Sequence, residues 1–287
     1  MLHGKLVVRR TTKALEFIDA ATLRVVETVE DSYAAICPAD RDAIYAFKSA
    51  PCAVERFDRT TSDGLLPIPG CSSSGSTMLV AGTSLYLAAS ESFVVYNVDK
   101  SGVTEAGKLG FKASADTQWF GLADGHMFIR RGRSVAVFQA AVMVAEWKTT
   151  QAIAHLQPGF ADRVWYSVWA ENEKDYLDRV VLAKTGSGLP TIATFSATRV
   201  THLAAGPDGG VAILAGFDNG WFIVVLDRDG LETRRILIPP SVYYSADRSV
   251  DITSCFVALT ATTVILDLHE QLLGWSLATG AAIARPA

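Results

Sequence analysis

A hairpin pattern that occurs seven times limits the possible fold more than any other feature of the chain. Each hairpin has two apolar runs of five to eight residues, rich in Val, Ile, Leu and aromatic residues, around a turn. The turns recur about every 43 residues. The hairpins occupy residues 15–29, 54–68, 93–109, 135–147, 180–195, 223–238 and 272–286. Helical periodicity is absent, so the sequence predicts an all-β repeat protein.

A second series of turns runs in phase with the first. These tight turns precede six of the hairpins and lie near Arg41, Thr83, Gly125, Asp162, Asp208 and Ala261. Each repeat therefore has four strands, a to d, and that unit length is typical of a propeller blade. We expect a single domain over residues 1–287, a seven-bladed β-propeller of four-stranded antiparallel blades. The blades are expected at about 5–30, 32–68, 76–109, 116–148, 152–196, 199–238 and 251–287.

The first blade lacks one turn of the second series, because the chain reaches strand b within its first ten residues. A three-stranded first blade explains this difference. The alternative is a strand borrowed from residues 241–257 or from a partner chain, since an unpaired strand edge attracts another strand.

Several turns resemble those of the WD-repeat and quinoprotein-type propeller superfamily. Asp19–Thr22 and Leu277–Gly280 look like its Asp-x-x-Thr-Gly turn between strands c and d, and Gly206–Gly209 looks like its ab turn. The chain departs from the WD-repeat pattern, because it has no Trp-Asp dipeptide and its Gly125-His126 pair lies in an ab turn. The resemblance implies the fold and no particular activity.

Charge and hydropathy exclude several classes of partner. The 26 basic and 30 acidic side chains give a net charge of −4, which does not favour nucleic acid. Residues 1–15 hold no secretory apolar segment, and no run of 18 apolar residues occurs. We therefore expect a cytoplasmic protein that binds neither membrane nor nucleic acid. The four cysteines show no metal-ligand spacing, so we expect buried or free thiols at Cys37, Cys52, Cys71 and Cys255.

The sequence contains no catalytic motif, and we expect no catalytic residue, cofactor or metal. The five histidines are scattered without a metal-binding spacing. His155 and His202 begin adjacent blades, near the channel where propeller enzymes keep their sites. One alternative is therefore a channel-centred enzyme, such as a lactonase-like hydrolase or a quinoprotein-type oxidoreductase. Another is a carbohydrate-binding propeller that uses tryptophans, although we expect the six tryptophans to pack between blades.

The charges of the bc and da loops point to a protein partner, because by resemblance to known propellers these loops emerge on one side. Basic residues come from blades one, two and four: Arg9, Arg10, Lys13, Lys48, Arg130, Arg131 and Arg133. Acidic residues come from blades five to seven: Glu171, Glu173, Asp175, Asp178, Asp218 and Glu270. A surface divided by sign suits oriented docking of another protein.

Aromatic residues in two of these loops complete the predicted surface. We expect a non-catalytic scaffold or adaptor that binds a partner protein, as a possible subunit of a larger bacterial complex. The candidate partner-binding residues are Arg9, Arg10, Arg130, Arg131, Arg133, Tyr176, Leu177, Tyr243 and Tyr244.

Overall fold

The computed structural model describes most of the chain. The described residues are 2–3, 6–40, 43–71, 78–88, 92–99, 102–109, 117–122, 125–170, 177–186, 189–245, 248–249, 251–268 and 271–283. Nearly all regular structure among them is β-strand.

Four antiparallel sheets come from the first half of the chain, each with its strands in sequence order. The first contains β1 (Leu2–His3), β2 (Leu6–Arg10), β3 (Ala14–Asp19) and β4 (Val25–Glu30). The second contains β5 (Ala35–Asp40), β6 (Ala43–Ser49), β7 (Cys52–Asp58) and β8 (Thr61–Pro67). The third contains β9 (Met78–Ala81), β10 (Ser84–Ala88), β11 (Phe93–Asp99) and β12 (Gly102–Leu109). The fourth contains β13 (Gln118–Gly121), β14 (His126–Arg131), β15 (Ser134–Gln139) and β16 (Val142–Lys148).

Three further sheets come from the second half. The fifth contains β17 (Ile153–Pro158), β18 (Arg163–Val168), β19 (Asp178–Lys184) and β20 (Thr191–Ala197). The sixth contains β21 (Arg199–Ala205), β22 (Val211–Phe217), β23 (Gly220–Leu226) and β24 (Glu232–Leu237). The last has three strands, β27 (Phe256–Leu259), β28 (Thr263–Asp267) and β29 (Leu272–Ser276). Before it come α1 (Pro240–Tyr243), the pair β25 (Tyr244–Ser245) and β26 (Arg248–Ser249), and a 3-10 turn, Ile252–Ser254.

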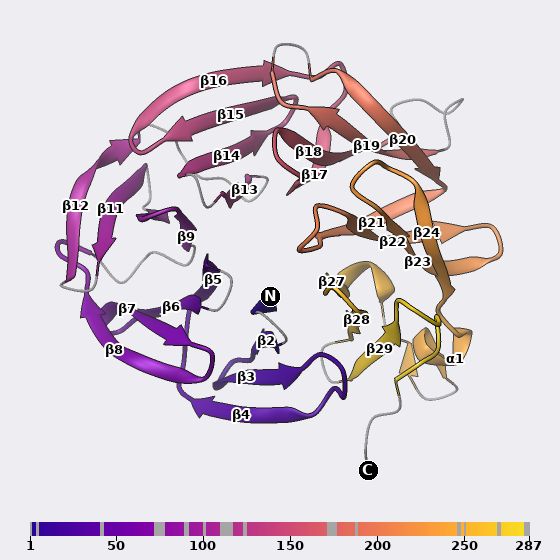
Figure 1. Cartoon of the computed structure of the whole chain (residues 1–287), viewed down its shortest axis with the longest axis horizontal. Helices are drawn as coiled ribbons and strands as arrows, with labels where there is room; N and C mark the ends of the chain where they lie inside the picture. Colours follow the sequence, from indigo (N-terminus) through magenta and orange to yellow (C-terminus); the bar gives the residue numbers. More distant parts are fainter. Residues whose placement is uncertain are drawn as a thin grey trace. The chain divides into compact units, whose positions relative to one another are not determined.

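These sheets confirm the predicted fold class, a seven-bladed β-propeller (Figure 1). The first sheet has the three strands expected from the sequence, β2 to β4, and β1 adds a two-residue strand beside β2. The borrowed-strand alternative for residues 241–257 is wrong, because that segment forms α1, the β25–β26 pair and the start of β27. In the last sheet a single bridge, Trp275 to Ala282, follows β29.

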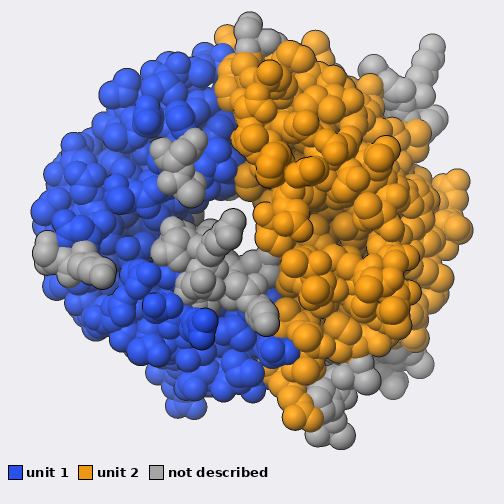
Figure 2. All heavy atoms as spheres, viewed as in Figure 1, with its two compact units in different colours: residues 1–19, 25–131, 135–146 blue, residues 20–24, 132–134, 147–287 orange. Residues whose placement is uncertain are grey.

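The chain divides into two compact units (Figure 2). The first comprises residues 1–19, 25–131 and 135–146, and the second comprises residues 20–24, 132–134 and 147–287. Most of the first four sheets thus belongs to the first unit, and the last three sheets belong to the second.

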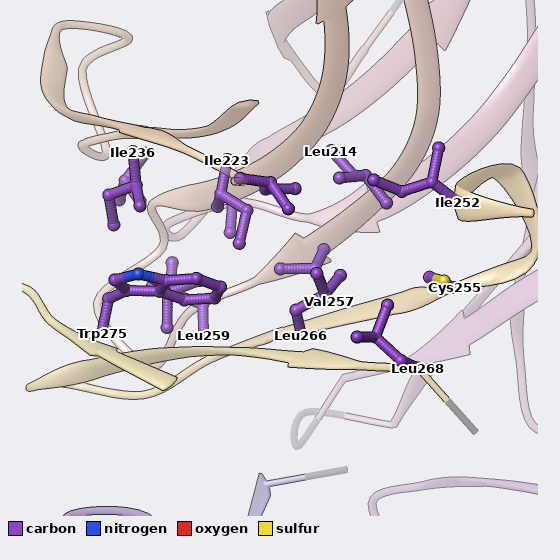
Figure 3. Close-up of a cluster of buried hydrophobic side chains, with 14 of the residues drawn as sticks. Leu214, Ile223, Ile236, Ile252, Cys255, Val257, Leu259, Leu266, Leu268 and Trp275 are labelled. Carbon is purple, nitrogen blue, oxygen red and sulfur yellow. The ribbon is translucent and has the colours of Figure 1, made fainter. Parts of the chain in front are cut away.

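Apolar packing between neighbouring sheets builds the core of the second unit (Figure 3). Leu214, Ile223 and Ile236 come from the sixth sheet and are buried against Leu266 and Trp275 of the last sheet. Burying one such side chain contributes about 1.5–3 kcal/mol. A single sheet cannot hide both of its faces, so each sheet depends on its neighbours.

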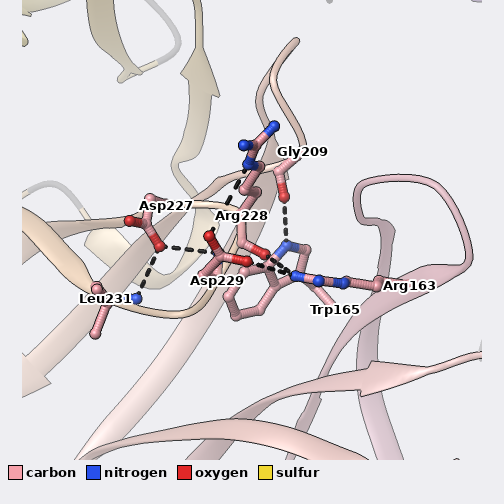
Figure 4. Close-up of polar contacts among 7 residues, drawn as sticks. All are labelled: Arg163, Trp165, Gly209, Asp227, Arg228, Asp229 and Leu231. Carbon is pink, nitrogen blue, oxygen red and sulfur yellow. Dashed lines mark hydrogen bonds and ion pairs between the residues drawn. The ribbon is translucent and has the colours of Figure 1, made fainter.

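A polar link joins the fifth and sixth sheets of the same unit (Figure 4). The buried Trp165 indole donates to the carbonyl of Gly209 over 2.9 Å, and Arg163 donates to the Asp229 carboxylate over 2.8 Å. Gly209 has a φ of +80°, and a Cβ there would lie 2.7 Å from the backbone of Phe160. Only glycine fits this turn, since it tolerates both the conformation and the close approach.

The cysteines differ from the sequence expectation. Cys52, at the start of β7, and Cys71, after β8, form a disulfide. The expectation of unpaired thiols was wrong for this pair, because two cysteines 19 residues apart meet only through the path of the intervening hairpin. Cys37 and Cys255 are buried free thiols, as expected. Burial raises the pKa of both, that of Cys255 to about 11.

Counting thiols tests this pairing. Under denaturing, non-reducing conditions we expect an alkylating reagent to label Cys37 and Cys255 only, whereas prior reduction exposes Cys52 and Cys71 as well. Intact-mass spectrometry distinguishes the two patterns. Labelling of Cys52 and Cys71 without reduction would contradict the disulfide. Protein from the native host is the decisive sample, because disulfides persist mainly in oxidising compartments.

Candidate interaction surface

Hydrogen bonds join bc turns to the connections between sheets. The carbonyl of Arg133, in the bc turn of the fourth sheet, accepts from the Thr149 N–H over 2.8 Å. The carbonyl of Gly132 accepts from the Ile153 N–H over 2.9 Å. In the second sheet, the carbonyl of Cys52 accepts from the Ile68 N–H over 3.1 Å, beside the disulfide. We call the bc turns and these connections together the bc/da surface, and we describe it within each unit separately.

Asp178 holds the bc loop of the fifth sheet to the start of β21. Its carboxylate oxygens accept from the Ala170 N–H over 3.1 Å and from the Val200 N–H over 2.8 Å. The side chain is buried, so both bonds replace contacts that water would otherwise make. Asp178 was counted among the acidic surface residues, but here it serves as an internal acceptor.

Two exposed apolar side chains flank that bc loop. Trp169 is 56% exposed and Leu177 is 47% exposed. The register of β18 and β19 places Val168 opposite Arg179, so Trp169 and Leu177 follow closely on opposite arms of the hairpin. Leu177 was predicted from the sequence, and Tyr176 lies outside the described residues.

Trp169 was missed. All six tryptophans were expected to pack between blades, and Trp165, four residues earlier in the same apolar run, is indeed buried. β18 ends at Val168, so Trp169 lies in the loop beyond the strand, whereas Trp165 lies within it. The signal available in the sequence is the polar loop that begins at Ala170.

Phe256 is a second missed residue, 54% exposed at the first position of β27. Its ring meets the His202 imidazole edge to face, with the ring centroids 5.3 Å apart. His202 lies on β21 two residues beyond Val200, which Asp178 binds. Phe256 therefore lies next to the strand that anchors the Trp169 loop.

The two predicted tyrosines of the da connection add no described exposed side chain to the bc/da surface. Tyr243 ends α1 and is buried in the apolar cluster between the sixth and last sheets. The backbone of Tyr244 begins β25, and its side chain lies outside the description. Tyr243 is therefore a core residue in the structure.

Arg10 and Lys48, from the first two sheets, meet at Tyr33. Arg10 donates to the carbonyl of Tyr33 over 3.0 Å, and the Lys48 ammonium lies 5.0 Å from the centre of its ring. Lys48 also pairs with Asp31 and Glu55. Burial lowers the pKa of Lys48, but these carboxylates outweigh burial and raise it above its ordinary value. Burial and the Glu55 hydrogen bond likewise raise the pKa of Tyr33.

The other predicted arginines differ in accessibility. Arg9 donates from Nε to the Glu16 carboxylate over 2.7 Å, so its charge is matched within the first sheet. Arg130 is buried at the end of β14. Arg131 and Arg133 are exposed on either side of Gly132, as are Arg10 and Lys13 in the first sheet. Among the predicted acidic residues, Asp218 is exposed and Glu171, Glu173, Asp175 and Glu270 lie outside the described residues.

The structure brings His155 of β17 and His202 of β21 together, with ring centroids 6.3 Å apart. His155 Nδ1 lies 2.8 Å from the buried Ser167 hydroxyl, and His202 Nδ1 accepts from the Val257 N–H over 3.3 Å. Within the described ranges, no three His, Cys, Asp or Glu side chains are grouped as they would be around a metal ion. No helix of the same ranges is long and apolar enough to cross a membrane.

The buried His202 makes stability depend on pH. Burial, together with the neighbouring His155, lowers the pKa of His202 from 6.5 to about 4. Between these values the unfolded chain binds a proton that the folded chain does not, so stability falls as the pH falls. The free energy of unfolding should decrease by up to about 3 kcal/mol from pH 7 to pH 4.

Urea denaturation across this range measures the slope. The variant His202→Gln should flatten it, because an amide oxygen can still accept from Val257 N–H but does not titrate. The variant His126→Gln, in the other unit, serves as a control for the loss of an imidazole. An unaltered slope in His202→Gln would contradict the assignment.

Solved structures share this fold at low sequence identity. Hsv2 of Kluyveromyces lactis is 11% identical, with a TM-score of 0.64 over 95% of this chain and 90% of that chain. A chain of the mitotic checkpoint complex is 13% identical, with a TM-score of 0.63 over 96% and 85%. A chain of Kuenenia stuttgartiensis hydrazine synthase is 9% identical, with a TM-score of 0.55 over 84% and 76%.

Neither a family model nor a curated protein sequence matches the chain. At these identities the likeness shows the fold alone. The chain has a WD-repeat-like β-propeller fold.

Proposed function

We propose that the chain is a non-catalytic scaffold that binds another protein through its bc/da surface. The observation that carries this proposal is the exposed pair Trp169 and Leu177 on a loop anchored by Asp178. Large exposed apolar side chains are normally single and scattered, whereas grouped ones on a held loop are typical of binding surfaces. Tryptophan is also among the residues that most often dominate binding energy.

The hydrogen bonds of Asp178 favour the interpretation that Trp169 and Leu177 bind a partner over the alternative that they are merely exposed to solvent. Asp178 bonds to backbone on both sides, at Ala170 and at Val200, so both ends of the loop are fixed before any partner arrives. Residues that are already fixed at the two ends of the loop lose less conformational entropy on binding, which favours affinity. Phe256, at the start of β27 in the same unit, is a further exposed aromatic residue, and its ring meets His202 of β21.

Exposed arginines supply the charged part of the proposed surface. Arg131 and Arg133 project from one bc turn, and the carbonyl of Arg133 is fixed by Thr149. Charges of this kind act mainly on the rate and orientation of encounter. Within the first unit, Arg10 is also exposed, whereas Arg9 and Lys48 are matched internally. We also propose that the bc/da surface carries basic residues on one side and acidic residues on the other.

The fold of similar solved chains gives coarse support. One of them is a chain of a mitotic checkpoint complex, so a propeller of this type can work inside an assembly. By that analogy we propose that this chain is a subunit of a larger complex in a bacterial cytoplasm. The thiol pattern in the native host tests the location, because a Cys52–Cys71 disulfide there would favour an oxidising compartment.

Variants in the second unit test the apolar part of the surface. Affinity purification from the native host, with quantitative mass spectrometry, should recover a partner with the unaltered chain. Trp169→Ala and Leu177→Glu should each reduce its recovery at least about tenfold, which corresponds to about 1.4 kcal/mol. The control is Leu231→Glu, because Leu231 is also an exposed leucine, at 68%, but lies in a cd turn. Equal losses in all three variants, or none, would contradict the proposal.

Charge reversal tests the basic part separately. Arg131→Glu with Arg133→Glu should slow association and weaken its dependence on salt, while the far-ultraviolet circular dichroism stays unchanged. The control is Arg228→Glu, on the cd turn of the sixth sheet. Surface plasmon resonance with the recovered partner at two ionic strengths gives both rates. An unchanged association rate would show that the arginines do not take part in binding, and the proposal for Trp169 and Leu177 would be unaffected.

A further inference from the structure

The outermost strand of the fourth sheet carries an exposed apolar segment. β16 is last in the order β13-β14-β15-β16, and Figure 1 draws it on the outer side of β15. Its first three residues are exposed, Val142 by 63%, Met143 by 56% and Val144 by 50%. An edge strand offers unpaired backbone groups, and apolar side chains on it favour the addition of another strand.

Three other outer strands in the described part of the chain, β4, β8 and β24, are better protected. β4 carries Glu27 and Glu30, and β24 carries Glu232 and two arginines. β8 contains Asp63, Gly64 and Pro67. Charges, glycine and proline on an edge discourage pairing with another chain. β20 carries no charge, but Ile192 is its single exposed large apolar residue.

β16 has charges only near its end, at Glu146 and Lys148. The segment Ala141–Ala145 contains neither charge nor proline nor glycine. The charges, glycine and proline found on β4, β8 and β24 are therefore missing over these five consecutive residues.

The turn before β16 is held in place by the third sheet. The Tyr86 hydroxyl donates to the carbonyl of Ala140 over 3.0 Å. Gly107 of β12 approaches Ala141 so closely that a Cβ on Gly107 would lie 3.4 Å from the Ala141 methyl. All of these residues belong to the first unit. The exposed edge is therefore preformed, which reduces the entropy lost on pairing.

The sequence of this edge is the same in both directions. Residues Ala141–Ala145 are Ala-Val-Met-Val-Ala, with Met143 at the centre. In an antiparallel pair of two copies related by a two-fold axis, Met143 faces Met143 and Val142 faces Val144.

We propose that β16 pairs edge to edge with β16 of a second copy of this chain, centred on Met143. The two sheets then continue through the interface, and every side chain of the five-residue segment meets an apolar one. Stable interfaces bury about 1,200–2,000 Å². Two five-residue strands cover less, so the dimer is weak and depends on concentration.

Sedimentation velocity over a concentration series tests this dimer in the full chain. The unaltered chain should shift from monomer to dimer as its concentration rises. Met143→Lys should raise the dissociation constant at least about tenfold, because the two-fold axis places the two lysines directly opposite. The control Val26→Lys, on the exposed outer strand β4, should leave association unchanged. A monomer at every concentration, or equal effects of both variants, would overturn the proposal.

Charge exchange tests the register. Met143→Lys and Met143→Glu should each be monomeric alone and should form a mixed dimer when combined, since position 143 faces itself. In addition, Met143→Cys should cross-link under mild oxidation, because directly opposed α-carbons about 4.5–5.5 Å apart are within the range of a disulfide. A dimer that persists in Met143→Lys, or no mixed dimer, would overturn the pairing. Loss of a different co-purified protein from Met143→Lys, with a monomeric unaltered chain, would assign the edge to that protein instead.

Discussion

Burial of both faces of each sheet is the constraint on which the rest of the structure depends. In β22 the residues from Val211 to Gly216 are all buried, so neither face of the strand meets water. Such a strand is stable only between two neighbouring sheets, and Leu214, Ile223 and Leu266 show this mutual cover in the second unit. The outer strand edges and the loops between strands are not subject to this constraint, so binding sites can form there.

Polar groups at the sheet junctions then decide where the loops lie. Trp165 and Arg163 fix the sixth sheet against the fifth at the ab and cd turns, and Asp178 fixes the bc loop to β21. Each of these donors or acceptors is satisfied by a group on a neighbouring element, so none is left buried without a partner. Trp169 immediately precedes Ala170, whose N–H bonds to Asp178, and its side chain is exposed.

The repeat made the fold predictable, and side-chain pairing limited what could be predicted of the site. Alternating apolar runs and turn residues are local, so strands such as β11 and β12 could be placed from the sequence alone. The Cys52–Cys71 disulfide, the burial of Tyr243 and the exposure of Trp169 depend on which segments meet in space. Phe256 shows the same limit, since an aromatic residue at a strand start has no sequence signal that separates core from surface.

Charged residues illustrate why composition is a poor guide to a surface. Lys48 and Asp178 both counted towards a divided face, yet Lys48 is matched by Asp31 and Glu55, and Asp178 binds two backbone N–H groups. A charged side chain that is paired with an opposite charge produces little electric field outside the protein, because the two fields nearly cancel there. Arg131, Arg133 and Asp218 are exposed, so the electrostatics of the docking that we propose would depend on them more than on the net charge of −4.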